Sequence, residues 1–210
     1  MRVDVKICGL RDAAMLDVAV GAGASHVGFV CFAPSPRHLG PDALAGLAAT
    51  APRACTRVAV VVDADDALLA AVAPAVDVLQ LHGREIPARV ADVRARFGKP
   101  VWKAAGVRTA ADVRALVRDF AGADALLFDA KAPEEAPMPG GNGLRFDWRA
   151  LAEVALPSRW VLSGGLDAAT VADAVRLTGA RAVDVSSGVE DAPGVKSAAK
   201  IRDFVKAAHG

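Results

Sequence analysis

The sequence lacks the features of several large classes of protein. Its net charge is only +1, from 25 basic and 24 acidic residues, whereas a nucleic-acid-binding protein usually carries a basic excess or stripe. The chain has no run of about 18 apolar residues, so we expect no membrane span. The N-terminal residues do not form a basic segment followed by an apolar one, so we expect no secretory signal peptide. We therefore expect neither nucleic acid nor a membrane among its partners.

Cysteine and histidine are also scarce. Cys8, Cys31 and Cys55 are odd in number and lack metal-ligand spacing, and the four histidines form no metal motif. We therefore expect no bound metal and a reducing, cytoplasmic compartment. Hydrophobic residues make up 53% of the chain, which is enough for a sizeable core, so disorder is not expected.

What the sequence does contain is a regular alternation of short β-branched runs and alanine-rich helical stretches. Strands that alternate with helices predict an α/β fold with parallel pairing and right-handed crossovers. Eight such units in 210 residues fit a compact (β/α)8 TIM barrel. The alternative is an open doubly wound sheet, but no Gly-x-Gly-x-x-Gly fingerprint follows the first strand. No linker rich in proline and serine divides the chain, so we expect residues 1–210 to form one domain.

The expected elements follow from the local pattern. Strands are predicted over residues 3–8, 26–32, 57–62, 78–82, 101–105, 125–129, 160–163 and 182–186. Helices are predicted over residues 12–20, 41–50, 65–73, 87–97, 109–120, 148–154, 168–177 and 197–208.

Alternation along each strand predicts which side chains enter the barrel interior. In the first strand, Val3, Val5 and Ile7 form the apolar outer face, so Lys6 points inward. Because the first and last strands of a closed barrel are neighbours, Lys6 and Asp184 are predicted to form a buried ion pair, within about 5 Å. The other residues predicted to point inward are Asp4, Cys8, Gln80, His82, Lys103, Leu127, Asp129 and Ser186.

Two side chains at strand ends are candidates for acid–base chemistry. Cys8 ends the first strand, and it is either a small buried hydrophobe or a base whose thiolate has to be stabilised. Asp129 ends the sixth strand, and it is either a loop-capping residue or a general acid whose pKa apolar surroundings raise. The two strands are not neighbours, so Cys8 and Asp129 can flank a small substrate across the barrel mouth.

Other loops at the same edge are candidates for substrate binding. Segments with Gly164 and Gly165 after the seventh strand, and with Ser187 and Gly188 after the eighth, predict a phosphate site, although each alone is also typical of a turn. Arg37 is either a group that binds a substrate carboxylate or a surface residue. His82 either contacts the substrate or fills the top of the barrel as a hydrogen-bonded side chain. Residues 131–145 form either a lid or a flexible insertion.

In their order along the chain, these segments resemble the phosphoribosylanthranilate isomerase family of tryptophan biosynthesis. The matching stretches span nearly the whole chain: residues 5–9, 27–30, 35–37, 79–83, 127–129, 146–148, 162–166, 183–190 and 193–194. One departure is Leu144, at the position where the family usually has a lysine after its glycine-rich loop; Arg145, which follows it, is the candidate substitute.

The resemblance implies an enzyme that needs no cofactor. It implies an Amadori rearrangement of N-(5-phospho-β-D-ribosyl)anthranilate to 1-(2-carboxyphenylamino)-1-deoxy-D-ribulose 5-phosphate. By family likeness, Asp129 protonates the furanose ring oxygen, Cys8 removes the C2 proton and Arg37 holds the anthranilate carboxylate. Backbone groups near Gly164, Gly165, Ser187 and Gly188 hold the phosphate.

Three other functions are alternatives to this one. The related isomerase of histidine biosynthesis uses aspartates on strands one and five, where this chain has Cys8 and Ala105. Indole-glycerol-phosphate synthase uses a lysine and a glutamate for ring closure. Lys103 is predicted to point inward, so this activity stays an alternative, but the motif around Cys8 does not fit it. A barrel without catalytic activity that serves as a scaffold is expected to lack the acid or the base, whereas this chain has both. A monomer is the default oligomeric state, with a homodimer as the alternative.

Overall fold

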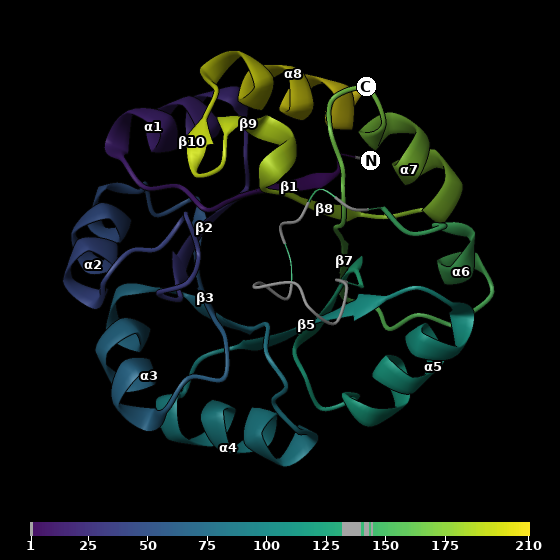
Figure 1. Cartoon of the computed structure of the whole chain (residues 1–210), viewed down its shortest axis with the longest axis horizontal. Coiled ribbons are helices and arrows are strands. Elements are labelled where there is room, and N and C mark those ends of the chain that lie inside the picture. Colours follow the sequence, from purple (N-terminus) through teal and green to yellow (C-terminus); the bar gives the residue numbers. More distant parts are fainter. Residues whose placement is uncertain (1, 132–139, 141–142, 144) are drawn as a thin grey trace.

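The computed structural model describes residues 2–131, 140, 143 and 145–210 of the chain. Within these ranges, eight parallel strands close into a barrel in sequence order, and β8 pairs with β1. Figure 1 looks down this barrel and shows the helices around its outside, so the expected (β/α)8 TIM barrel is confirmed. The strands are β1 (Asp4–Cys8), β2 (His26–Cys31), β3 (Thr56–Val61), β4 (Val78–Leu81), β5 (Val101–Val107), β6 (Ala125–Ala130), β7 (Trp160–Leu162) and β8 (Ala182–Val185).

Several helices begin and end where the sequence supplies caps. At the start of α1 the Asp12 carboxylate accepts a hydrogen bond from the backbone of Met15, and Gly23 ends this helix with a φ of 106°. Thr109 and Asp112 form a capping box at the start of α5. The helices are α1 (Ala13–Ala22), α2 (Pro41–Thr50), α3 (Asp66–Val72), α4 (Pro87–Phe97), α5 (Ala110–Asp119), α6 (Arg149–Ala152), α7 (Val171–Thr178) and α8 (Ala198–His209), with a 3₁₀ turn η1 (Ala73–Ala75) after α3.

Four helices are shorter than predicted, and the local structure accounts for two of them. The helix expected over residues 148–154 is the single turn α6, whose N-cap residue Trp148 makes no side-chain capping hydrogen bond. The helix expected over residues 168–177 begins only at Val171, because the Thr170 hydroxyl binds Asp167 and holds residues 167–170 in a turn.

A short hairpin that the sequence analysis did not predict follows β8. The 3₁₀ turn η2 (Ser187–Val189) leads into β9 (Glu190–Ala192), which pairs antiparallel with β10 (Val195–Lys196). Gly194 turns the hairpin with a φ of 79°, and a Cβ at this position would overlap the backbone carbonyl of Pro36. The hairpin therefore packs against the loop between β2 and α2.

The predicted alternation of side chains is confirmed in β1 and β8. Val5, Ile7 and Val183 are fully buried in the core between the strands and the helices. On the opposite face of these strands, the Lys6 ammonium lies 2.8 Å from the Asp184 carboxylate, so the predicted ion pair is confirmed. Other inward residues form a separate small core of Ala104, Leu127 and Val161, with Trp102 and Ala182 packed against it.

The prediction that Lys103 points into the barrel is wrong. Its neighbours Trp102 and Ala104 belong to the inner core, so Lys103 faces the outer layer of β5. There its ammonium lies 2.8 Å from the Glu85 carboxylate and 5.6 Å from the centre of the Phe120 ring. The alternative function of an indole-glycerol-phosphate synthase depended on an inward Lys103. The outward position of Lys103 removes the support for that alternative.

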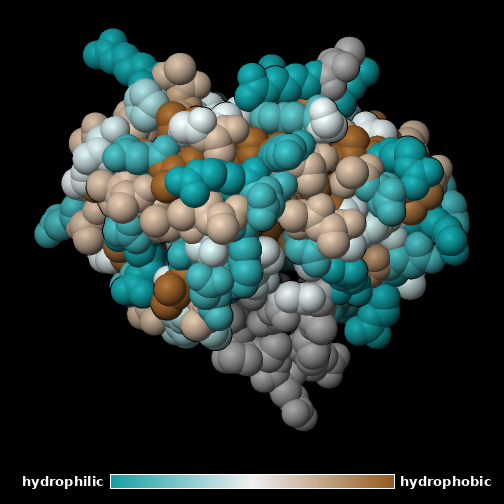
Figure 2. All heavy atoms as spheres, turned by 90° about the horizontal axis from the view of Figure 1, so that it is seen from above, coloured by the Kyte–Doolittle hydropathy of each residue, from teal (hydrophilic) through white to brown (hydrophobic). Residues whose placement is uncertain are grey.

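The exterior adds little to the functional assignment. On the face shown in Figure 2, hydrophobic residues lie scattered among polar ones. In the part of the chain that the structure describes, no helix is long and apolar enough to cross a membrane. The lid prediction falls mainly on residues 132–139, 141–142 and 144, which include Leu144 and lie outside the described residues.

Candidate active site

A pocket opens at the carboxyl ends of the barrel strands. The space between its walls amounts to about 780 Å³, part of which is open to solvent. Its walls come from β1, β2, β3, β4, β6 and β8 and from the loops that follow β2, β3, β4, β6, β7 and β8. The pocket brings together all the residues that the sequence analysis assigned to the site: Cys8, Arg37, His82, Asp129, Gly164, Gly165, Ser187 and Gly188.

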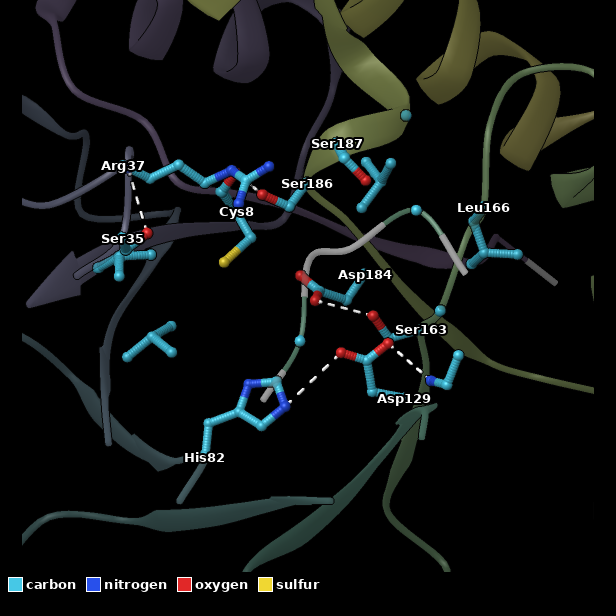
Figure 3. A pocket seen from close by; sticks show the side chains of 18 of the residues that line it. Cys8, Ser35, Arg37, His82, Asp129, Ser163, Leu166, Asp184, Ser186 and Ser187 are labelled. Carbon is cyan, nitrogen blue, oxygen red and sulfur yellow. Dashed lines mark hydrogen bonds and ion pairs between the residues drawn. The ribbon is translucent and has the colours of Figure 1, made fainter. Parts of the chain in front are cut away.

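Cys8 is the last residue of β1, and its thiol points into the pocket (Figure 3). Gly9 turns the chain immediately afterwards with a φ of 78°, and the Ser186 hydroxyl donates to the Cys8 carbonyl at 3.2 Å. Burial raises the pKa of the Cys8 thiol above its ordinary value, and the Lys6 charge offsets part of this rise. A thiolate in this position therefore needs positive charge beside it.

Asp129 reaches into the pocket from β6 (Figure 3). One carboxyl oxygen accepts a hydrogen bond from the Ala130 backbone at 2.8 Å, and the other lies 3.6 Å from Nε2 of His82. Burial, reinforced by the charge of Lys103, lowers the pKa of His82 to about 4. His82 is therefore neutral at pH 7 and brings no positive charge to the Asp129 carboxyl.

The neutral state of His82 predicts a pH-dependent stability. Its pKa is about 4 in the folded chain and about 6.5 when unfolded, so between these values the unfolded chain binds the extra proton. The folded state is therefore expected to lose stability as the pH falls from 6.5 toward 4, by up to about 3 kcal/mol. Urea unfolding at pH 7, 6 and 5 should show a smaller loss for His82→Gln than for the wild type. Parallel losses in the two proteins would contradict a buried, neutral His82.

Arg37 is buried rather than exposed, which removes the surface-residue alternative. Only 5% of it is accessible, and its Nε and Nη2 each lie 2.7 Å from a carboxylate oxygen of Glu190 in β9. Lys196 of β10 binds the same carboxylate at 2.8 Å. Burial opposes ionisation of Glu190, but these two cations outweigh it and hold its pKa below the ordinary value. The hairpin thus fixes the Arg37 guanidinium at the edge of the pocket.

The loops after β7 and β8 meet at the other side of the pocket. Gly164 and Gly165 have φ values of 89° and 64°, which other residues rarely adopt. Gly188 lies so close to the Leu166 carbonyl that a Cβ there would overlap it. Arg145 is not among the pocket-lining residues: its Nε donates to the Gly165 carbonyl at 2.7 Å and its Nη2 binds Asp167. Its contact is with the loop after β7.

Some residues of the site received no role from the sequence. Ser35, Gln80, Asp184 and Ser186 line the pocket. Gln80 and Ser186 were predicted only to point inward, and Asp184 was predicted only as the ion-pair partner of Lys6. Glu190 and the hairpin that carries it were missed as a support for Arg37. The signal in the sequence is the Ser-Ser-Gly-Val-Glu stretch of residues 186–190. It places the Glu190 carboxylate two residues after Gly188, a candidate for the phosphate site.

Comparison with known proteins gives the same result as the motifs. Residues 5–207 match the family model described as N-(5'phosphoribosyl)anthranilate (PRA) isomerase. A protein of Paracoccus denitrificans named N-(5'-phosphoribosyl)anthranilate isomerase is 55% identical over 207 residues, which cover 98% of this chain and 96% of that protein.

Solved structures agree in both fold and coverage. Phosphoribosyl anthranilate isomerase from Thermotoga maritima superposes with a TM-score of 0.87 at 32% identity, covering 98% of each chain. A phosphoribosyl anthranilate isomerase in complex with reduced 1-(o-carboxyphenylamino)-1-deoxyribulose 5-phosphate has a TM-score of 0.82 at 30% identity, again over 98% of each chain. The chain belongs to the phosphoribosylanthranilate isomerase family, as its motifs indicated.

Proposed function

We propose that this chain catalyses the Amadori rearrangement of N-(5-phospho-β-D-ribosyl)anthranilate in tryptophan biosynthesis. The observation that carries the proposal is the placement of a thiol and a carboxyl, from Cys8 and Asp129, in one pocket that also contains an arginine and two glycine-rich loops. The family match over residues 5–207 supports the same reaction. The product is 1-(2-carboxyphenylamino)-1-deoxy-D-ribulose 5-phosphate.

The reaction moves protons without adding or removing atoms overall, so general acid and base groups are sufficient for it. The Asp129 carboxyl protonates the ring oxygen, the bond between C1 and this oxygen breaks, and a Schiff base forms at C1. The Cys8 thiolate then removes the proton from C2, and its electron pair moves toward C1 to give an enolamine. The enolamine takes a proton at C1 and loses one from the C2 hydroxyl, which leaves the ketone.

The two ends of the substrate are anions, and the pocket offers a group for each. The Arg37 guanidinium would hold the anthranilate carboxylate, and Glu190 fixes the orientation of this guanidinium. The backbone near Gly164 and Gly188 would hold the phosphate, since glycines let main-chain N–H groups approach an anion closely. With both ends held, the ribosyl carbons would lie between Cys8 and Asp129.

The direct test is the loss of anthranilate-type fluorescence when purified protein meets freshly made phosphoribosylanthranilate. We expect rapid loss, with the ketone product identified by mass spectrometry after borohydride reduction. No turnover, with inorganic phosphate still bound in the pocket, would instead indicate a different sugar phosphate or a scaffold barrel.

A glycine substitution tests the phosphate end separately. In Gly188→Ala the new Cβ would overlap a backbone carbonyl, so the loop after β8 must move away from the loop after β7. We expect the dissociation constant for inorganic phosphate, measured by calorimetry, to rise by about tenfold or more, equivalent to roughly 1.4 kcal/mol. The matched control is Gly46→Ala in α2, where a Cβ has no neighbour within 4 Å. Equal affinities in the two variants would place the phosphate elsewhere.

Three further proposals complete the assignment. Residues 1–210 would act as one catalytic domain. The three cysteines, all unpaired in the structure, are consistent with a cytoplasmic enzyme. The oligomeric state, a monomer or a homodimer, stays a prediction that light scattering on the purified protein can decide.

A further inference from the structure

The buried ion pair below the pocket lies directly beside the proposed base. The Lys6 side chain is 2% exposed, and its ammonium donates to one oxygen of Asp184 at 2.8 Å. The other oxygen of Asp184 accepts a hydrogen bond from the Ser163 hydroxyl at 3.2 Å. Asp184 is therefore held at both oxygens, and it in turn holds the Lys6 ammonium in one place.

Lys6 and Cys8 share the inner face of β1, and a glycine on β2 leaves the space in which they meet. Gly28 is the register partner of Cys8 across the two strands. A Cβ built on Gly28 would lie 2.9 Å from the Cys8 sulfur and 3.0 Å from the Lys6 nitrogen. Both polar atoms thus converge on the one position in β2 that has no side chain.

The charge around the thiol comes from several elements. His26, the register partner of Lys6, has its pKa lowered by burial and adds no charge at neutral pH. Two cations near the thiol, Arg37 and Lys196, also bind the Glu190 carboxylate. The groups that face Cys8 among the described residues are Lys6 on its own strand, Asp184 on β8, Lys196 on β10 and Arg37 after β2, while His82 and Asp129 line the same pocket.

We propose that Lys6 is a positioning residue whose ammonium favours the thiolate form of Cys8, the form that removes the substrate proton, and that Asp184 limits this effect. The ammonium is available to the thiolate because it is permanently charged: burial opposes its charge, but Asp184 and Cys8 outweigh burial and raise the pKa of Lys6. Proton transfer to Cys8 removes the thiolate charge, and Lys6 then retains its pairing with Asp184. The proposal depends on the proposed function only in taking Cys8 as the base.

Two substitutions of opposite charge test the proposal. Lys6→Met removes the cation at nearly constant length, and Asp184→Asn removes the anion at constant shape. The readout is the pH dependence of Cys8 alkylation by iodoacetamide in the full chain, followed by mass spectrometry of the Cys8 peptide. We expect the midpoint to move up by about one pH unit or more in Lys6→Met, since an opposite charge within about 4–6 Å lowers a pKa by roughly 1–3 units. In Asp184→Asn we expect it to move down.

Two further variants separate this effect from loss of structure. Lys6→Met leaves Asp184 buried without its partner, which destabilises the fold. The double variant Lys6→Met/Asp184→Asn leaves neither charge unpaired, and its midpoint should still move up, by less, because Lys6 acts on the thiol more strongly than Asp184 does. The matched control is Lys103→Met, which breaks a buried lysine–carboxylate pair in the outer layer. It should leave the Cys8 midpoint unchanged.

The outcomes distinguish this proposal from the proposed function. Opposite midpoint shifts in the single variants, or an upward shift in the double variant, support it even if the chain does not turn over phosphoribosylanthranilate. With turnover, the acidic limb of kcat/KM should shift upward in pH for Lys6→Met as the alkylation midpoint does. An unchanged midpoint in folded Lys6→Met or in the double variant, or shifts of the same sign in both single variants, would overturn it.

Discussion

Cys8→Ser is expected to lower kcat by about a thousandfold, within the roughly 10²–10⁴-fold range of general base catalysis, with a small change in KM. Sulfur and oxygen occupy nearly the same place, so the substrate can still bind between Arg37 and the glycine-rich loops. A serine hydroxyl, however, ionises far less readily than a thiol, and the nearby Lys6 ammonium cannot make up the difference. The measurement is the fluorescence assay, run over a range of substrate concentrations so that kcat and KM separate.

The matched control for this substitution is Cys31→Ser. Cys31 is 2% exposed and lies in the outer core of β2, away from the pocket, so the same change of atom tests only the cost of burying a hydroxyl. We expect Cys31→Ser to lower stability and to keep kcat. Substrate deuterated at C2 adds an independent check, because proton removal by Cys8 predicts a primary isotope effect when this step limits the rate. A Cys8→Ser variant that keeps more than about a tenth of wild-type kcat is incompatible with a thiolate base.

Asp129→Asn is expected to lower kcat by about a hundredfold to a thousandfold. An asparagine amide keeps the shape of the carboxyl, and its oxygen can still accept the hydrogen bond from the Ala130 backbone that Asp129 accepts at 2.8 Å. It has no acidic proton to give to the ring oxygen, and a neutral His82 with a pKa of about 4 has none to give either. Ring opening then depends on solvent.

A second aspartate, at the start of the segment that carries Asp129, provides the control. Asp124 lies just before β6, at the opposite end of the barrel, and accepts a hydrogen bond from the Val101 backbone at 2.8 Å. Asp124→Asn therefore repeats the chemical change and the loss of charge without touching the pocket. We expect it to retain wild-type kcat. If Asp124→Asn and Asp129→Asn lost activity equally, the loss would reflect barrel stability, and the assignment of Asp129 as the acid would fail.

The parts of the site that the sequence predicts best lie on strands with strict alternation. In β1 the apolar residues Val5 and Ile7 leave Lys6 and Cys8 only one possible face, and closure of the barrel then determines which strand faces Lys6. Positions at strand ends are equally clear, because a parallel barrel brings all its carboxyl ends to one side. This is why the pattern predicts that Cys8 and Asp129 lie at the mouth of the barrel, where both line the pocket.

The parts that were missed have no comparable pattern. In β5, Val101 and Trp102 are consecutive apolar residues, so alternation does not decide which of them faces inward, and Lys103 was placed on the wrong face. The support of Arg37 comes from Glu190, which is 153 residues away in a hairpin too short to show a period. Long-range partners of this kind follow from the packing of loops, which the local sequence does not encode.

The Lys6–Asp184 pair also bears on how the chain is made. The two residues are 178 positions apart, in the first and last strands of the barrel. At a synthesis rate of roughly 5–20 residues per second, Lys6 is added to the chain about 9–36 seconds before Asp184 is. A nascent chain that has not yet reached β8 cannot bury this lysine as an ion pair. Closure of the barrel, and with it the environment of the thiol, therefore has to wait until synthesis is nearly complete.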